Sequence, residues 1–197
     1  ENIKLSQQQI ESLKNKKLTA ALVWHGSSAW VSAVNQGAKE TFSRFGIDVV
    51  AVTDAQFDPA KQVADLENIS VLNPDIILSL SVDSTSTKNS YRNAINNGAK
   101  LVLLSNPIEG FIHHQDYVGI VTDDMFGMGK AAAQLTIDAL NQSGKTGSGK
   151  LGIIYHDAKY FITNNRDQAF RQALKSAANI DIIIEKGFVK ESETSNI

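Results

Sequence analysis

Residues 18–37, LTAALVWHGSSAWVSAVNQG, decide the fold class of this chain. Residues 18–24 are almost continuously apolar, which is typical of a strand covered on both faces of its sheet. Residues 25–28 interrupt that run with small and polar side chains. Apolar side chains then recur at helical spacing: Trp30, Val31, Val34 and Ala38. In an open parallel sheet, a loop between such a strand and helix lies at the carboxyl ends of the strands, where ligands bind.

The same alternation of strand and helix continues along the chain. Further strands are predicted at residues 47–52, 75–80, 100–104, 117–121, 151–155 and 180–184. Helices are predicted at residues 30–45, 59–72, 84–97, 125–141 and 163–178. This alternation predicts an α/β fold with parallel sheets flanked by helices and right-handed crossovers.

Local signals indicate where several helices begin and end. Ser6 with Gln9 fits a capping box for a short first helix. Gly46 is expected to end the helix before it in a left-handed conformation. Pro59 is expected at the start of a helix that turns its apolar side chains inward. These inward side chains are Val63, Leu66, Ile69 and Leu72.

The predicted elements fall into two sets. Residues 1–17 form an amino-terminal helical extension, residues 18–122 a first domain, and residues 123–197 a second. The second set has only two strands, and a lone two-strand parallel unit buries little apolar surface. We therefore expect the second domain to be incomplete in this chain.

Composition excludes several classes of protein. The 197 residues carry a net charge of -2, which offers no basic surface, so no nucleic-acid partner is expected. The chain has no cysteine, which excludes disulfides, thiolate zinc sites and a cysteine nucleophile. Apolar runs are only as long as strands, so no direct membrane insertion is expected. No signal peptide is visible, which suits a cytoplasmic protein or the mature form of an exported one.

Motifs that would indicate a cofactor, a metal or catalysis fail on inspection. Residues 144–150 resemble a phosphate-binding loop, but Leu151 stands where a hydroxyl is required, and the stretch precedes a strand. His113 and His114 are expected to point in different directions from a surface loop, with no third metal ligand nearby. No Gly-x-Ser-x-Gly elbow is present. We expect no cofactor, no metal site and no enzyme activity.

Seven stretches together resemble one protein family. They are WHGSSAWVSAVNQGAKE, FDPAKQVADLENI, DIILSLSVDST, GAKLVLLSNP, YVGIVTDDMFGMGKAAA, GKLGIIYHD and NNRDQAFRQAL. In this order and spacing, the chain resembles the amino-terminal part of a periplasmic sugar-binding protein of ABC transporters, of the ribose-binding type. The resemblance implies a two-lobed, type I periplasmic-binding-protein-like fold. Each lobe is a parallel sheet flanked by helices, the first at residues 18–122 and the second, incomplete here, at residues 123–197.

The resemblance implies ligand contacts from the first lobe. His25, Ser28 and Trp30 fall where the family places polar contacts and a stacking aromatic ring. An indole can cover the C–H face of a sugar while fixed polar groups bind its hydroxyls. Trp24 is a further candidate, with core packing as the alternative. Asp83 matches an acidic position near the cleft, with helix capping as the alternative.

Other implied contacts come from the later strands and the second lobe. Ser105 and Asn106 stand where ribose-type members usually carry Asp-Arg, so a charged bidentate group is lost and ribose itself is put in doubt. Asp123 lies at the expected first crossing between lobes. In the second lobe, Arg166 matches a ligand-binding arginine, with a solvated charge as the alternative. The remaining candidates there are Asn164 and the aromatic pair Tyr160 and Phe161, for which lobe packing is the alternative.

The function that the resemblance implies is an extracytoplasmic solute-binding protein. It would capture a small sugar or polyol by lobe closure and deliver it to the membrane permease of an ABC transporter. The alternative is the sugar-sensing extracellular domain of a receptor or chemotaxis system. The expected location is periplasmic or extracellular, with a lipid anchor on the full-length precursor left open. Inositols, pentoses, hexoses and other polyols all remain open as ligands.

Overall fold

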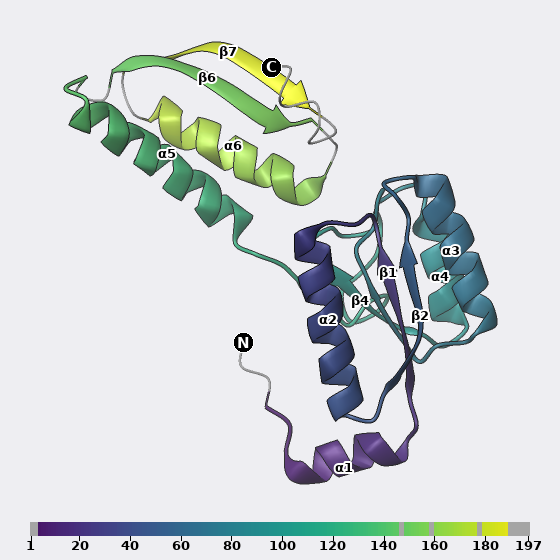
Figure 1. Cartoon of the computed structure of the whole chain (residues 1–197). Coiled ribbons are helices and arrows are strands. Elements are labelled where there is room, and N and C mark those ends of the chain that lie inside the picture. Colours follow the sequence, from purple (N-terminus) through teal and green to yellow (C-terminus); the bar gives the residue numbers. More distant parts are fainter. Residues whose placement is uncertain (1–3, 146–147, 158–159, 177–178, 189–197) are drawn as a thin grey trace. The chain divides into compact units, whose positions relative to one another are not determined.

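The computed structural model describes residues 4–145, 148–157, 160–176 and 179–188. The chain divides into two compact units, Glu1–Thr122 (unit 1) and Asp123–Ile197 (unit 2). Each unit is an α/β layer structure in which helices cover a parallel sheet (Figure 1). The predicted fold class is confirmed.

Unit 1 is built on a five-stranded sheet with the strand order β2-β1-β3-β4-β5. All neighbouring strands in it are parallel. In chain order its elements are α1 (Gln7–Asn15), β1 (Thr19–Trp24), α2 (Ala29–Arg44), β2 (Asp48–Asp54), α3 (Pro59–Val71), β3 (Ile76–Ser79), α4 (Lys88–Asn96), β4 (Lys100–Leu104) and β5 (Gly119–Val121). The chain leaves β1 for β2 on one side and then crosses to β3 on the other, so strand order reverses next to β1.

Helices cover both faces of this sheet, with α2 on one side and α3 and α4 on the other (Figure 1). Alternate side chains of a strand point to opposite faces. Leu22 on β1 accordingly packs with Val31 of α2. Its neighbour Val23 packs on the opposite face with Leu66 of α3 and Tyr91 of α4. The continuous apolar run in β1 is thus explained by burial on both sides.

Several predicted helix ends are confirmed. Ser6 Oγ accepts a hydrogen bond from Gln9 N at 3.2 Å, and Gln9 Oε1 accepts one from Ser6 N at 2.8 Å, which completes the capping box of α1. Gly46 follows α2 with a φ of 70°. Pro59 is the first residue of α3, and Asp58 caps that helix through its side chain.

Two details of the sequence prediction are wrong. Leu72, predicted to point inward, is 52% exposed, and α3 ends one residue earlier, at Val71. The buried positions of α3 instead include a polar residue, Gln62. Helix α4 begins at Lys88 rather than at residue 84, because the intervening residues fold into a turn around the Asp83 carboxylate.

The surface loop before β5 also differs from expectation. His113 and His114 are exposed, as predicted, but their rings stack with centroids 3.7 Å apart instead of diverging. His113 Nε2 also lies 3.0 Å from the backbone oxygen of Val118. Local contacts within the loop therefore account for the conformation of both imidazoles.

Unit 2 contains α5 (Met125–Gln142), β6 (Gly149–His156), α6 (Phe161–Lys175) and β7 (Ile180–Phe188). Strands β6 and β7 form a parallel two-stranded sheet, with both helices on one side of it (Figure 1). A Cβ at Gly129 of α5 would lie 2.2 Å from the backbone oxygen of Arg166 in α6, so glycine permits the close packing of these two helices. Ile154 and Ile184 on the two strands remain more than half exposed.

Part of the predicted structure lies outside the described residues. The helix predicted to reach residue 178 ends at Lys175, and Ala177 and Ala178 are not described. Strand β6 begins at Gly149, so the glycine- and lysine-rich stretch at residues 144–150 leads into a strand, as expected, and does not open a helix. Thr146 and Gly147 within that stretch are not described.

Candidate functional site

The candidate site of unit 1 lies along the edge where its parallel strands end. β1 ends at Trp24, which pairs in register with Asp54, the last residue of β2. Val23 pairs with Ser79, the last residue of β3. Because all strands run the same way, the loops that follow them emerge side by side at this edge. Every unit 1 residue predicted to contact ligand is in or next to one of these loops.

The loop after β1 places two tryptophans in different environments. Trp24 is 3% exposed, packs in the core with Leu22 and Val31, and donates from Nε1 to Asn35 Oδ1 at 3.1 Å. Trp30, in the first turn of α2, is 48% exposed. The structure therefore places Trp24 beneath the loop and leaves the Trp30 ring available on the surface.

Ser28 begins α2. Its Oγ accepts a hydrogen bond from Val31 N at 3.1 Å, which satisfies one of the free amides at the start of the helix. The Ser28 hydroxyl can still donate a hydrogen bond, because the cap uses only its oxygen as an acceptor. Its structural role is capping, and a ligand contact through the proton remains compatible with that role.

His25 is the first residue of the loop after β1 and contacts Phe57 in the loop after β2. Its backbone oxygen accepts a hydrogen bond from Phe57 N at 2.6 Å, and its ring meets the Phe57 ring edge to face, with centroids 4.8 Å apart. Burial lowers the pKa of His25 to about 4, although the nearby Asp54 carboxylate opposes the shift. The imidazole is thus uncharged at neutral pH. Its Nδ1 is buried and has no hydrogen-bond partner in the described structure.

Asp83 organises the loop after β3. Its Oδ1 accepts hydrogen bonds from Thr85 N at 2.8 Å and from Ser86 N at 2.6 Å, as well as from the Ser86 hydroxyl. The Ser86 backbone bond is the largest cause of a pKa of Asp83 below its usual value. Asp83 is therefore an ionised carboxylate that shapes this loop.

Buried polar side chains support the loop after β3 from below. Gln62 is fully buried; its Nε2 donates to Leu80 O at 3.0 Å and its Oε1 accepts from Val82 N at 2.8 Å. The Tyr91 hydroxyl lies 2.5 Å from Ser79 Oγ, which itself donates to the backbone of β1. Burial raises the pKa of Tyr91 to about 12. These groups fix the path of the chain toward Asp83.

The loop after β4 carries Ser105 and Asn106. Ser105 has a φ of 58° and donates from its backbone to Val121 O at 2.9 Å, which joins this loop to β5. Asn106 Oδ1 is buried and has no hydrogen-bond partner in the described structure. Asp123, just beyond β5, is exposed and is the first residue of unit 2. An unsatisfied amide oxygen is thus present at the same edge as His25.

The candidates in unit 2 gather at the amino end of α6. Phe161, its first residue, is 61% exposed, and Asn164 in the next turn is exposed as well. The Tyr160 ring stacks on that of His156, with centroids 5.4 Å apart. Arg166 donates from Nε to Asp167 Oδ1 at 3.0 Å. The structure thus brings these candidates onto one end of one helix.

One exposed aromatic residue at this edge was not predicted from the sequence. Phe57 lies in the loop between β2 and α3, next to His25, with 55% of its side chain exposed. The stretch FDPAKQ contributed to the family resemblance, but only its proline was interpreted structurally. The sequence feature that could have identified Phe57 is a large aromatic side chain in a loop, directly before the N-cap residue of a helix.

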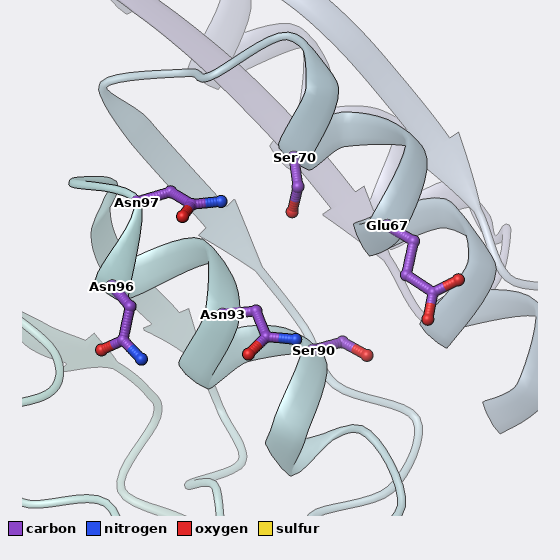
Figure 2. A pocket seen from close by; sticks show the side chains of 6 residues that line it. All are labelled: Glu67, Ser70, Ser90, Asn93, Asn96 and Asn97. Carbon is purple, nitrogen blue, oxygen red and sulfur yellow. The ribbon is translucent and has the colours of Figure 1, made fainter.

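A separate polar groove of about 480 Å³ lies between α3 and α4 (Figure 2). It is lined by Glu67, Ser70, Ser90, Asn93, Asn96 and Asn97. None of the predicted ligand contacts lines it. Within the part of the chain that the structure describes, no three potential metal ligands come together.

Comparison with protein families shows to which family this chain is related. A family model described as periplasmic binding protein domain matches residues 6–196. The chain belongs to the periplasmic binding protein family. The predicted family is confirmed at this level. Comparison with curated proteins gives no significant match.

Solved structures share the fold of this periplasmic binding protein. One is an ABC transporter periplasmic solute binding protein from Actinobacillus succinogenes 130z with bound D-allose, with 20% identity and a TM-score of 0.76; the match covers 91% of this chain and 62% of that one. Another is an ABC transporter solute binding protein from Burkholderia graminis C4D1M in complex with D-arabinose, with 17% identity, a TM-score of 0.74, and coverage of 87% and 56%. A third, from Mycobacterium smegmatis with bound glycerol, has 23% identity, a TM-score of 0.74, and coverage of 85% and 55%.

The chain therefore spans little more than half the length of these solved structures. At sequence identities of 17–23%, the similarity to these structures shows a shared fold and nothing more specific. Over the described ranges, none of the helices combines the length and the apolar character needed to cross a bilayer.

Proposed function

We propose that this periplasmic binding protein captures a small sugar or polyol outside the cytoplasm and delivers it to the permease of an ABC transporter. The observation that carries the proposal is the set of side chains at the edge of the unit 1 sheet where its parallel strands end. There, His25 Nδ1 and Asn106 Oδ1 are buried and have no hydrogen-bond partner among the described residues, and the Trp30 ring is exposed. Buried polar atoms without partners are rare in folded proteins, so a ligand that pairs with them would remove an unfavourable feature.

This combination of groups suits a hydroxylated ligand. A sugar hydroxyl can donate to Asn106 Oδ1, and it can either donate to or accept from an imidazole nitrogen, depending on the tautomer. The C–H face of a sugar ring can pack on the exposed indole of Trp30. Asp83 holds its loop through Oδ1, which leaves Oδ2 as a further acceptor. Trp24 and Ser28 support the loop, and Ser105 directs the chain at Asn106.

The proposed mechanism is hinge closure. The ligand docks on unit 1, and unit 2 then closes over it and displaces water. Asp123 lies at the proposed hinge. In unit 2, Phe161 and Tyr160 supply aromatic surface, while Asn164 and Arg166 supply donors. The guanidinium uses its Nε in the bond to Asp167, so its terminal nitrogens can bind hydroxyls. Binding without chemical turnover is all that this role requires.

The experiment is isothermal titration calorimetry on the full-length protein with D-allose, D-arabinose, D-ribose, myo-inositol and glycerol. The sugar or polyol that binds the wild type is then titrated into a Trp30→Ala, Arg166→Ala double variant. We expect at least a hundredfold loss of affinity, because a stacking ring and a charged donor are removed together. Retention of full affinity by the double variant would contradict the proposed site.

A matched control tests whether such a loss is specific. The Leu135→Ala, Arg44→Ala double variant also removes one exposed apolar and one basic side chain, but neither lies at the candidate site. We expect it to bind the same ligand with unchanged affinity. An equal loss in both double variants would indicate general damage to the protein and would remove the support for a site at Trp30 and Arg166.

A further inference from the structure

The loop between β2 and α3 contains two adjacent residues in the left-handed conformation. Gln56 has a φ of 54° and Phe57 a φ of 60°. This conformation is a genuine outlier for a bulky aromatic residue, and such outliers persist only where surrounding contacts impose them. Here Gln56 N donates to Asp54 Oδ1 at 2.8 Å, and Phe57 N donates to His25 O at 2.6 Å. The loop is thus held by both strands that end beside it.

The strained backbone places the Phe57 ring directly over the loop after β1. A Cβ added at Gly26 would lie 2.4 Å from the ring, so only glycine allows this close approach. The same ring meets the His25 imidazole edge to face at an interplanar angle of 76°. Yet more than half of the Phe57 side chain remains exposed, so core packing does not explain why the conformation is maintained.

We infer that Phe57 is a positioning residue of the binding site: its ring fixes the His25 imidazole and screens it from water. The two rings form an uncharged wall at the edge of the sheet, and this wall favours the C–H face of a neutral sugar or polyol. The role in ligand choice rests on the function proposed above, whereas the role in positioning His25 does not.

Charge at this wall follows from the same contacts. Among the described residues, the charged group that acts on His25 is the Asp54 carboxylate, which favours a protonated imidazole. Burial has the larger effect, so the pKa of His25 falls to about 4. Removing the Phe57 ring exposes the imidazole to water and weakens the burial effect. The Asp54 carboxylate then acts with less opposition, so the imidazole becomes easier to protonate.

The test compares Phe57→Asn and Phe57→Leu with the wild type in the full-length protein. Asparagine tolerates the left-handed conformation, so Phe57→Asn removes the ring while relieving the backbone, and it should fold. Leucine keeps apolar cover over His25. Leu72→Ala is the matched control, because it truncates a side chain of similar exposure in the same unit.

The first readout is the pKa of His25, measured by NMR titration of the imidazole. We expect Phe57→Asn to raise it from about 4 toward 6.5, Phe57→Leu to raise it less, and Leu72→Ala to leave it unchanged. An unchanged pKa in Phe57→Asn would overturn the positioning role. This readout needs no ligand, so it decides the inference even if the protein binds no sugar.

The second readout is affinity for whichever of D-allose, D-arabinose, D-ribose, myo-inositol and glycerol binds the wild type. We expect Phe57→Asn to lose roughly tenfold, as for the loss of one aromatic contact. A raised pKa of His25 with unchanged ligand affinity would contradict the claim that the Phe57 ring contacts the ligand, while supporting its role in positioning His25. If no sugar or polyol binds the wild type, the sugar-binding proposal and the ligand part of this inference fail together.

Discussion

Replacement of Gln62 by methionine should destabilise unit 1 although the side chain keeps its shape. Gln62 is fully buried and connects α3 to the end of β3 through bonds to Leu80 O and Val82 N. Methionine fills a similar volume but can make neither bond. A buried backbone group left without a partner costs about 1–3 kcal/mol, so losing two partners should lower the free energy of unfolding by about 2–6 kcal/mol.

The assay is urea unfolding at 25 °C, followed by tryptophan fluorescence, to which the buried Trp24 and the exposed Trp30 both contribute. Gln36→Met on α2 is the control, because Gln36 is exposed and its side chain, within the described part of the chain, bonds only to Glu40 on the same helix. We expect the control to change stability by no more than about 0.5 kcal/mol. A loss below about 1 kcal/mol for Gln62→Met, or one no larger than the control's, would refute the claim that this glutamine holds the loop leading to Asp83.

Three further predictions concern other side-chain and helix contacts. Tyr91→Phe removes the hydroxyl bonded to Ser79 and should lower the free energy of unfolding by about 1 kcal/mol in the same urea assay; an unchanged value would contradict the bond. Gly129→Leu forces α5 away from α6, so thermal unfolding followed by circular dichroism should show a lower melting temperature, and an unchanged one would contradict the close packing. The Arg92 guanidinium lowers the pKa of Asp116, so this carboxylate stabilises the fold above its unfolded-state pKa, and that contribution is lost as pH falls through its folded-state pKa. Asp116→Asn should therefore flatten the decline in unfolding free energy below about pH 4, and an equally steep decline would count against the pair.

The architecture of the chain was predictable because it depends on patterns among residues that are close together in the sequence. A strand buried on both faces must be apolar throughout, and the run ending at Trp24 shows this directly. Helix signals were equally local, as Ser6, Gly46 and Pro59 show. Each acts through its own backbone or through residues three or four positions away, so one sequence suffices to interpret them.

The misses have a common physical reason, which is pairing between residues distant in sequence. Gln62 looks like an ordinary exposed helix residue until β3 supplies a backbone oxygen and a backbone amide for it. Phe57 becomes significant only when the loop after β1 brings His25 and Gly26 beneath its ring.

The measurement that tests the central claim most directly is a thermal-shift screen of the full-length protein against sugars, polyols, amino acids and nucleosides. A ligand that binds only the folded state at a hundred times its dissociation constant adds about 2.7 kcal/mol of stability, which raises the melting temperature by several degrees. We predict such a shift with one sugar or polyol. A shift only with an amino acid or a nucleoside, or none with any compound, would contradict the claim that this protein captures a sugar or polyol.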